Sequence, residues 1–150
     1  MKKLFTALAL LAATAAHADN PRPDIIAYDT DQSFEDVVFG LENTILDAGL
    51  VVDHISHTGE MLARTKEDVG GTMDLFLQAD VYSFCSAQVS REVMEDDPLN
   101  LVFCPYDIFV MVRADTPDTT TIGFRTYPEG AMKKVETMLD DIARAAIGLD

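Results

Sequence analysis

The chain has little positive charge, and this shortage limits its partners. Its 150 residues include 11 lysines and arginines against 26 aspartates and glutamates, which gives a formal net charge of −15. Such a surface repels nucleic-acid phosphates and anionic lipid headgroups, so we expect neither a nucleic acid nor a membrane surface as a partner. A solvated acidic surface explains the excess of acids, and a basic partner or a bound cation would also be compatible with it.

Several catalytic signatures are missing from the sequence. There is no glycine-rich phosphate loop, no Gly-x-Ser-x-Gly and no His-Glu-x-x-His. Cys104-Pro105-Tyr106 begins like a thioredoxin-type motif, but Asp107 stands where the second cysteine belongs. A Cys-x-x-Cys-His haem attachment motif is absent as well. This pattern favours a non-catalytic binding or accessory protein, and the sequence does not indicate its ligand.

The N-terminus carries the pattern of a secretory signal. Two lysines precede an apolar run from Leu4 to Ala16, and Ala16-His17-Ala18 places small residues at positions −3 and −1 of a cleavage site. The apolar run of ~13 residues is shorter than the ~20 residues that a membrane-spanning helix needs. We therefore expect cleavage after Ala18, export to the bacterial periplasm, and a mature chain, residues 19–150, that forms one domain without a membrane segment.

Hydrophobic periodicity predicts strands and helices that alternate along the mature chain. Ser33 and Asp36 resemble a capping box, and apolar residues at helical spacing follow them. The segment 106–113 has apolar side chains on both faces, which indicates a central strand, and 119–126 is expected to pair antiparallel with it. Further strands are expected at 24–28, 50–57 and 81–86, and helices at 34–48, 60–67, 89–94 and from Pro128 to the C-terminus. This order predicts an α+β fold with two layers, in which helices pack on one face of a mainly antiparallel sheet.

Cys85 and Cys104 are the only cysteines in the chain. In an oxidising compartment, two cysteines most often form a structural disulfide. The loop of ~20 residues that the bridge would close corresponds to roughly 3 kcal/mol in the chain-entropy model. Two free thiols or a redox-active pair are the alternatives, although no lysine or arginine lies near Cys104 in the sequence to favour a reactive thiolate.

The candidate ligand-binding residues are His57, Met61, Cys104 and Tyr106. Side chains of Cys, His and Met suit copper or haem iron, so a haem or metal cofactor is possible, although no cofactor is firmly implied. If 50–57 is a strand, the odd spacing puts His54 and His57 on opposite faces, and a shared metal would need a bulge or a turn. Structural histidines and methionines that fill the core are the simpler explanation.

Five short motifs together resemble a known family. They are Asp47-Ala48-Gly49-Leu50, His57-x-x-x-Met61-Leu62-x-Arg64-Thr65, Phe84-Cys85-Ser86-Ala87, Asp97-Pro98-x-Asn100-Leu101 and Cys104-Pro105-Tyr106-x-Ile108. The resemblance is to the exported proteobacterial branch of the domain-of-unknown-function family numbered 302, and it extends from Ile25 to Ile147. It implies an α+β fold and a homodimer, and it assigns no activity. The alternatives to a binding protein are a thiol–disulfide redox or haem/metal protein that uses the cysteine pair, and a purely structural homodimer module.

Overall fold

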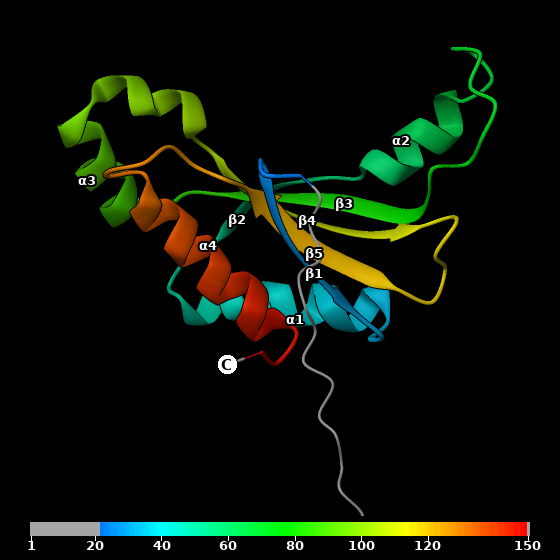
Figure 1. The fold of residues 1–150 in the computed structure, drawn as a ribbon, viewed down its shortest axis with the longest axis horizontal. Helices are drawn as coiled ribbons and strands as arrows, with labels where there is room; N and C mark the ends of the chain where they lie inside the picture. The colour runs from blue at the N-terminus through cyan, green and yellow to red at the C-terminus, as the bar shows by residue number, and fades with distance from the viewer. Residues whose placement is uncertain (1–21, 150) are drawn as a thin grey trace, which may run out of the picture.

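The computed structural model describes residues 22–149, which form a five-stranded sheet and four α-helices (Figure 1). The predicted signal peptide, residues 1–18, lies outside the described residues. In chain order the elements are β1 (Ile25–Thr30), α1 (Phe34–Asp47), β2 (Val52–Ser56), α2 (Thr58–Thr65), β3 (Phe76–Phe84), α3 (Ala87–Asp96), the 3-10 helix η1 (Pro98–Phe103), β4 (Tyr106–Arg113), β5 (Thr120–Arg125) and α4 (Lys133–Ala146).

The strands lie in the order β1-β5-β4-β3-β2, and every neighbouring pair is antiparallel. The predicted central strand is confirmed, because β4 is the middle strand. Its predicted antiparallel pairing with the following strand, β5, is also confirmed, with Val110 opposite Ile122. The sheet is therefore assembled mainly from consecutive elements, and only β1 crosses over to the far edge.

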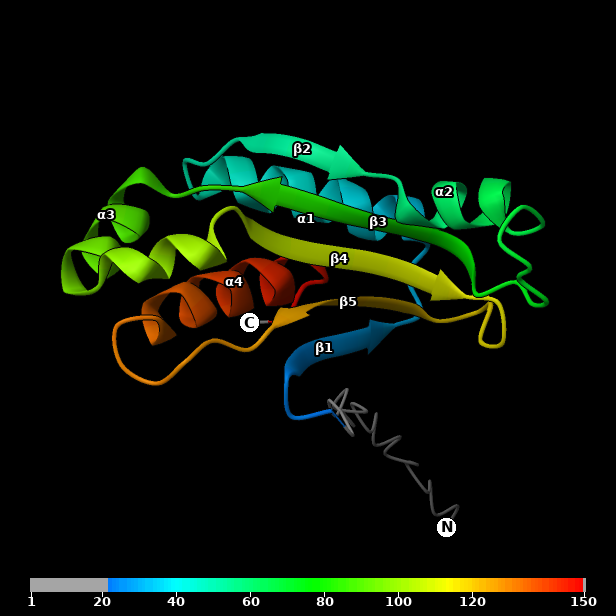
Figure 2. The same cartoon turned by 90° about the horizontal axis from the view of Figure 1, so that it is seen from above.

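One face of the sheet is covered by α1 and α4. Tyr106, Ile108 and Val110 of β4 point to this face and are fully buried, as are the apolar stripes of the two helices. Those stripes consist of Val37, Leu41 and Ile45 in α1 and of Val135, Leu139 and Ile142 in α4. Figure 2 shows the strands in front, with α1 behind them. The predicted α+β class, with helices on one face of an antiparallel sheet, is confirmed.

The close contact of α1 with α4 depends on a glycine. A Cβ at Gly40 would lie 2.1 Å from the carbonyl oxygen of Ala146.

Ser33 caps α1, since its side chain accepts a hydrogen bond from the Asp36 backbone N–H at 3.1 Å. Ser33 is therefore the N-cap that the sequence indicates, and its hydroxyl also donates to the Asp36 carboxylate at 2.8 Å.

Several element boundaries differ from the sequence-based predictions. The strand predicted from residue 81 begins at Phe76, and the strand predicted to include His57 ends at Ser56. The final helix begins at Lys133 rather than at Pro128, because Tyr127 is buried and its backbone N–H binds the Glu136 carboxylate. At Asp97-Pro98 the 3-10 helix η1 begins, and the Asp97 side chain accepts a hydrogen bond from the Leu99 N–H. Within residues 22–149, no helix is both long and apolar enough to cross a membrane.

Candidate functional site

The two cysteines lie side by side at the end of the sheet next to α3. Cys85 follows the last residue of β3, and Cys104 lies between η1 and β4. Because Phe84 pairs with Tyr106 across the sheet, the two sulfur atoms are only 3.5 Å apart. Both thiols are free in the structure. A bridge requires a separation of about 2.05 Å between the sulfurs, so the disulfide remains a prediction.

The surroundings of the thiols do not favour a reactive thiolate. Burial and, after it, the neighbouring thiol of Cys104 raise the pKa of Cys85 to about 11, although part of the residue is exposed. A raised pKa keeps this sulfur protonated near neutral pH, whereas attacking thiols generally have lowered values. On the other side, Ser90 Oγ lies 3.5 Å from Cys104 Sγ and 3.0 Å from the Tyr106 hydroxyl oxygen. The arrangement suits an inert bridge better than a catalytic thiol.

Aromatic side chains support this end of the sheet. The ring centroid of Tyr127 is 5.6 Å from that of Phe103 and 6.3 Å from that of Tyr106. The Tyr127 hydroxyl is buried and has no hydrogen-bond partner among residues 22–149, and burial raises its pKa. The Arg125 guanidinium lies over the Phe103 ring at 5.7 Å. Phe103, Tyr106 and Tyr127 therefore pack against one another beside the cysteines.

His57 lies where β2 ends and α2 begins, beside Asp80 in the middle of β3. Its Nδ1 is 3.0 Å from Asp80 Oδ1. The side chain of Asp80 is only 14% exposed, whereas that of His57 is 58% exposed. β2 ends at Ser56, which pairs with Val81 of β3, and α2 then lies beside the same strand. Because His57 joins β2 to α2, it lies next to Asp80. The hydrogen bond fixes the orientation of the ring and leaves Nε2 available for another partner.

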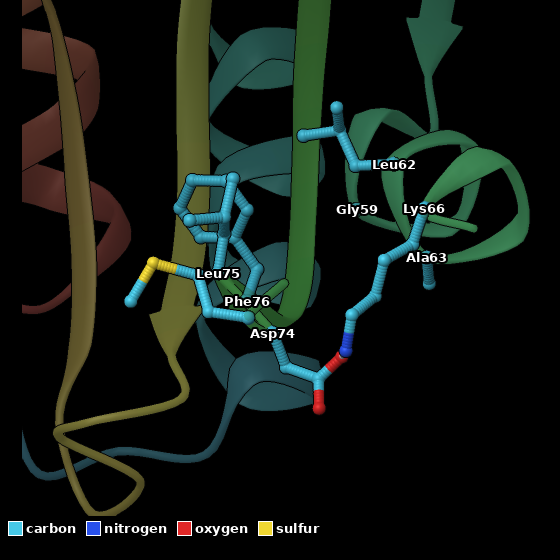
Figure 3. A pocket seen from close by; sticks show the side chains of 8 residues that line it. Gly59, Leu62, Ala63, Lys66, Asp74, Leu75 and Phe76 are labelled. Atoms are coloured by element: carbon cyan, nitrogen blue, oxygen red, sulfur yellow. The ribbon is translucent and has the colours of Figure 1, made fainter. Parts of the chain in front are cut away.

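A cleft of about 350 Å³ lies between α2 and β3 beside this pair. Its lining includes His57, Glu60 and Asp80 together with apolar side chains of α1, α2 and β3. A second hollow of about 30 Å³, close to the size of one water molecule, adjoins it and is shown in Figure 3. There Lys66, the C-cap of α2, reaches toward Asp74, and the two form an ion pair at 2.8 Å. Met61 is on α2 but lines neither hollow.

The candidate ligand-binding residues therefore divide into two pairs. Cys104 and Tyr106 lie near each other at the α3 end of the sheet, and His57 and Met61 lie at the α2 end (Figure 1). His54 is on β2 opposite Ser83, whereas His57 follows the end of that strand and contacts Asp80. In the part of the chain that the structure describes, no group of three or more His, Cys, Asp or Glu side chains could hold a metal ion.

Asp80 has no signal in the sequence that marks it as a functional residue. Asp80 is 23 residues from His57, inside a strand whose extent was predicted too short. Only the register of β2 against β3 brings the two side chains together. Neither periodicity nor a motif contains that register, so the pair could be found only from the fold.

Within residues 22–149, the second face of the sheet carries no helix, and we call it the open face. It contains the alternate side chains of each strand, since the others point to α1 and α4. The half-buried apolar residues on it are Ile25, Ala27, Val81, Phe109 and Met111. The Phe109 ring lies across Gly123 of β5, where a Cβ would come within 2.8 Å of Cζ. A depression of about 420 Å³ over Val81 and Phe109 extends to the strand ends at Asp107 and Arg125.

Charges flank the apolar part of the open face. On β4 this face shows, in order, Asp107, Phe109, Met111 and Arg113. Asp107 accepts a hydrogen bond from Ser83 Oγ at 2.6 Å, and Arg113 contacts Asp115 at 2.6 Å. On the central strand, Asp107 and Arg113 therefore stand on either side of two large apolar side chains, and Arg113 is also paired with Asp115.

Comparison with known proteins confirms the resemblance in part. Residues 26–147 match the family described as "Domain of unknown function DUF302". A solved structure of an uncharacterized conserved protein DUF302 from Bacillus stearothermophilus is similar, with a TM-score of 0.60 and 17% sequence identity over 83% of this chain and 94% of that chain. No match is found among curated proteins. The structural likeness supports the fold alone, and the match over residues 26–147 establishes that this chain belongs to the DUF302 family.

Proposed function

We propose that this protein is an exported accessory domain that acts by binding rather than by catalysis, and that its main binding surface is the open face of the sheet. The observation that carries the proposal is the apolar centre of this uncovered face, formed by Val81, Phe109 and Met111. A sheet face left open toward solvent is normally polar. An apolar one is typical of a surface that another molecule covers.

The partner that fits this face best is a second copy of the chain. Consider a two-fold axis that lies between the two sheets, passes over Val110 and is perpendicular to β4. It exchanges residues of β4 that are at equal distances from Val110. It places Asp107 opposite Arg113 of the second copy and Phe109 opposite Met111 of the second copy. Both pairs occur twice, as an isologous interface requires. The charges on the central strand are thus self-complementary in this arrangement.

The size of the open face also suits a dimer. Five strands spaced ~4.8 Å apart and a central strand of eight residues at ~3.4 Å per residue span roughly 24 by 27 Å. This corresponds to about 650 Å² for each copy, which is near the ~800 Å² per partner of a standard interface. Two such sheets would pack about 10 Å apart, with their apolar side chains between them.

Sedimentation velocity on charge-reversed variants tests this interface. We expect the wild-type protein to be dimeric at concentrations on the order of 100 µM, which detects even modest affinity. Asp107→Arg or Arg113→Asp alone should shift it to monomer, because each puts like charges opposite one another. The double variant restores opposite charges and should recover the dimer. Arg91→Asp, a reversal on the exposed surface of α3, is the matched control and should leave the dimer intact.

Two results would overturn the interface. One is a wild-type protein that stays monomeric over this concentration range. The other is a dimer that survives both single reversals, which would place the contact elsewhere. Export is tested separately by N-terminal sequencing of periplasmic material, in which we expect Asp19 as the first residue. A first residue of Met1 would contradict both the compartment and the disulfide argument that depends on it.

A redox function of the cysteine pair is the second candidate. It is favoured by the 3.5 Å between the two sulfurs and by the exposure of Cys85. The raised pKa of Cys85 argues against it. The reduction potential distinguishes the two roles, since a structural bridge resists the glutathione pool and a catalytic one does not.

A further inference from the structure

We propose that the cleft between α2 and β3 binds a small organic cation with an apolar body, of the chemical class of the primary alkyl- and arylamines. The cleft contains hydrogen-bond acceptors, negative charge and apolar walls, and no lysine or arginine lines it. This site is separate from the open face, so it does not depend on the homodimer.

The acceptors come from His57 and Glu60. In the neutral imidazole, the proton on Nδ1 is donated to Asp80, and the free nitrogen Nε2 is left as an acceptor. His57 is the N-cap of α2 and Glu60 lies in its first turn, and the side chains of both residues line the cleft. The Glu60 carboxylate makes no hydrogen bond or ion pair within residues 22–149. An ammonium group in the cleft can therefore donate hydrogen bonds to His57 Nε2 and to the Glu60 carboxylate.

Charge in and around the cleft selects a cation. Asp80 and Glu60 contribute two carboxylates, and Glu35 lies nearby, where it accepts a hydrogen bond from Gln78 of the cleft lining at 2.8 Å. The net charge of −15 on the chain adds a negative potential over the whole surface. An anionic ligand would meet repulsion from each of these groups.

The walls of the cleft suit an apolar body. Phe34 and Phe76 contribute aromatic rings, and Ala63 and Leu77 contribute aliphatic surface. Aromatic faces also attract ammonium groups. A volume of about 350 Å³ lies at the small end of the range for ligand pockets, ~300–1,000 Å³. An amine of the size of benzylamine fits this space, whereas a large cofactor does not.

Isothermal titration calorimetry with three probes of one shape tests the proposal. The probes are benzylamine, benzyl alcohol and benzoate, in phosphate buffer near neutral pH, so that only the charge of the polar group changes. We expect benzylamine to bind the wild-type protein with a Kd on the order of 1 mM or below, at least about tenfold more tightly than benzyl alcohol, and benzoate not to bind.

Variants then assign the binding to the cleft. Glu60→Gln should weaken the affinity for benzylamine about tenfold. His57→Phe keeps an aromatic ring but removes the acceptor nitrogen, and it should weaken the affinity by a similar factor. Asp141→Asn, which removes one acid from the exposed side of α4, is the matched control and should leave the affinity unchanged. Both Glu60 and His57 are exposed, so these variants should fold, and circular dichroism checks that they do.

Three outcomes would overturn the inference. They are no binding of benzylamine up to concentrations on the order of 10 mM, equal binding of benzylamine and benzyl alcohol, and equal weakening by Glu60→Gln and Asp141→Asn. The last outcome would show that benzylamine responds only to total charge. None of these results bears on the dimer, so the two proposals fail separately.

Discussion

At the scale of single residues, Glu136 joins the last strand to the last helix. Its carboxylate accepts hydrogen bonds from the Tyr127 backbone N–H and from Lys133 Nζ, both at 2.8 Å. Partial burial opposes ionisation of this carboxyl, but the bonds from Lys133 and Tyr127 outweigh it and lower its pKa below the usual 4.5. The ionised Glu136 carboxylate therefore stabilises the turn at Tyr127 that follows β5.

Replacement of Glu136 should make the protein less sensitive to acid. The pKa of this carboxyl is lower in the folded state, so the unfolded state binds more protons as pH falls. The stabilisation is complete above the unfolded value and is lost as pH falls through the folded one. We expect Glu136→Gln to lower the free energy of unfolding by about 1 kcal/mol near pH 7, and to flatten its dependence on pH below 5.

Urea unfolding between about pH 7 and pH 3 measures both effects. Glu129→Gln provides the control, because Glu129 contacts the same lysine but its side chain is 91% exposed. A Glu136→Gln variant with the acid sensitivity of the wild type would contradict the prediction.

At the scale of elements, α3 and η1 contact the rest of the molecule through few residues, among them the fully buried Val93 and Ser90, whose Oγ lies 3.0 Å from the Tyr106 hydroxyl oxygen. Cys85 precedes α3, and Cys104 follows η1, so a bridge between them would close the whole segment. Several large apolar side chains of η1 are exposed, among them Leu99, Leu101 and Val102. The segment therefore has few buried contacts of its own, and cross-linking its two ends should matter for its stability.

We expect the oxidised protein to be more stable than the reduced protein by roughly 3 kcal/mol, because the bridge restricts the unfolded chain. Chemical unfolding with and without reductant measures the difference. The variant with both Cys85→Ser and Cys104→Ser should be insensitive to reductant. If the unfolded, unreduced protein shows two free thiols on titration, no bridge forms and the prediction is wrong.

The contact of α2 with the sheet depends on Gly59. A Cβ at this position would lie 2.7 Å from the backbone nitrogen of Ala79. The helix has no buried residue, so it cannot compensate for a displacement by packing elsewhere. Gly59→Ala should therefore move α2 away from β3 and open the cleft.

Amide hydrogen exchange is the measurement for this variant. We expect faster exchange confined to α2 and the first residues of β3, with α1 and α4 unchanged. Thr65→Ala, at the far end of the same helix, controls for a general loosening of α2. Unchanged exchange in Gly59→Ala would mean that the helix tolerates the extra carbon where it is.

At the scale of the whole molecule, the dominant feature is negative charge. The 26 acidic residues outnumber the basic ones by 15, and several of the ion pairs in the structure are exposed. Exposed ion pairs contribute little, at ~0–1 kcal/mol each, so they do not offset the repulsion among the remaining acids. Folding brings these charges closer together, which costs free energy at low ionic strength.

Salt should therefore stabilise this protein. Raising sodium chloride from about 0.01 M to about 0.15 M shortens the screening length from ~30 Å to ~8 Å, and we expect a gain on the order of 1 kcal/mol. Thermal unfolding in sodium chloride and in potassium chloride measures the effect and separates screening from ion-specific binding. Stability that falls or stays constant as salt is added would contradict the account.

Much of the fold could be predicted from the sequence. The cap at Ser33 and the stripe of α1 depend on residues within a few positions of each other, so local spacing was sufficient. The alternation of Tyr106–Arg113 likewise indicated β4 and its central place. The start of α4 was predicted too early, because the buried Tyr127 and its bond to Glu136 outweigh the helical preference of Pro128 at a first turn.

Composition, short-range periodicity and short motifs are enough to predict the fold class, the negative surface and the family, because all three are local properties of the chain. Which side chains meet depends on the tertiary structure. The register of β3 between β2 and β4 places Asp80 against His57 and Phe84 beside Tyr106, and so separates the histidine from the cysteines. That register depends on how the whole apolar face packs against α1 and α4, and no local pattern in the sequence contains it.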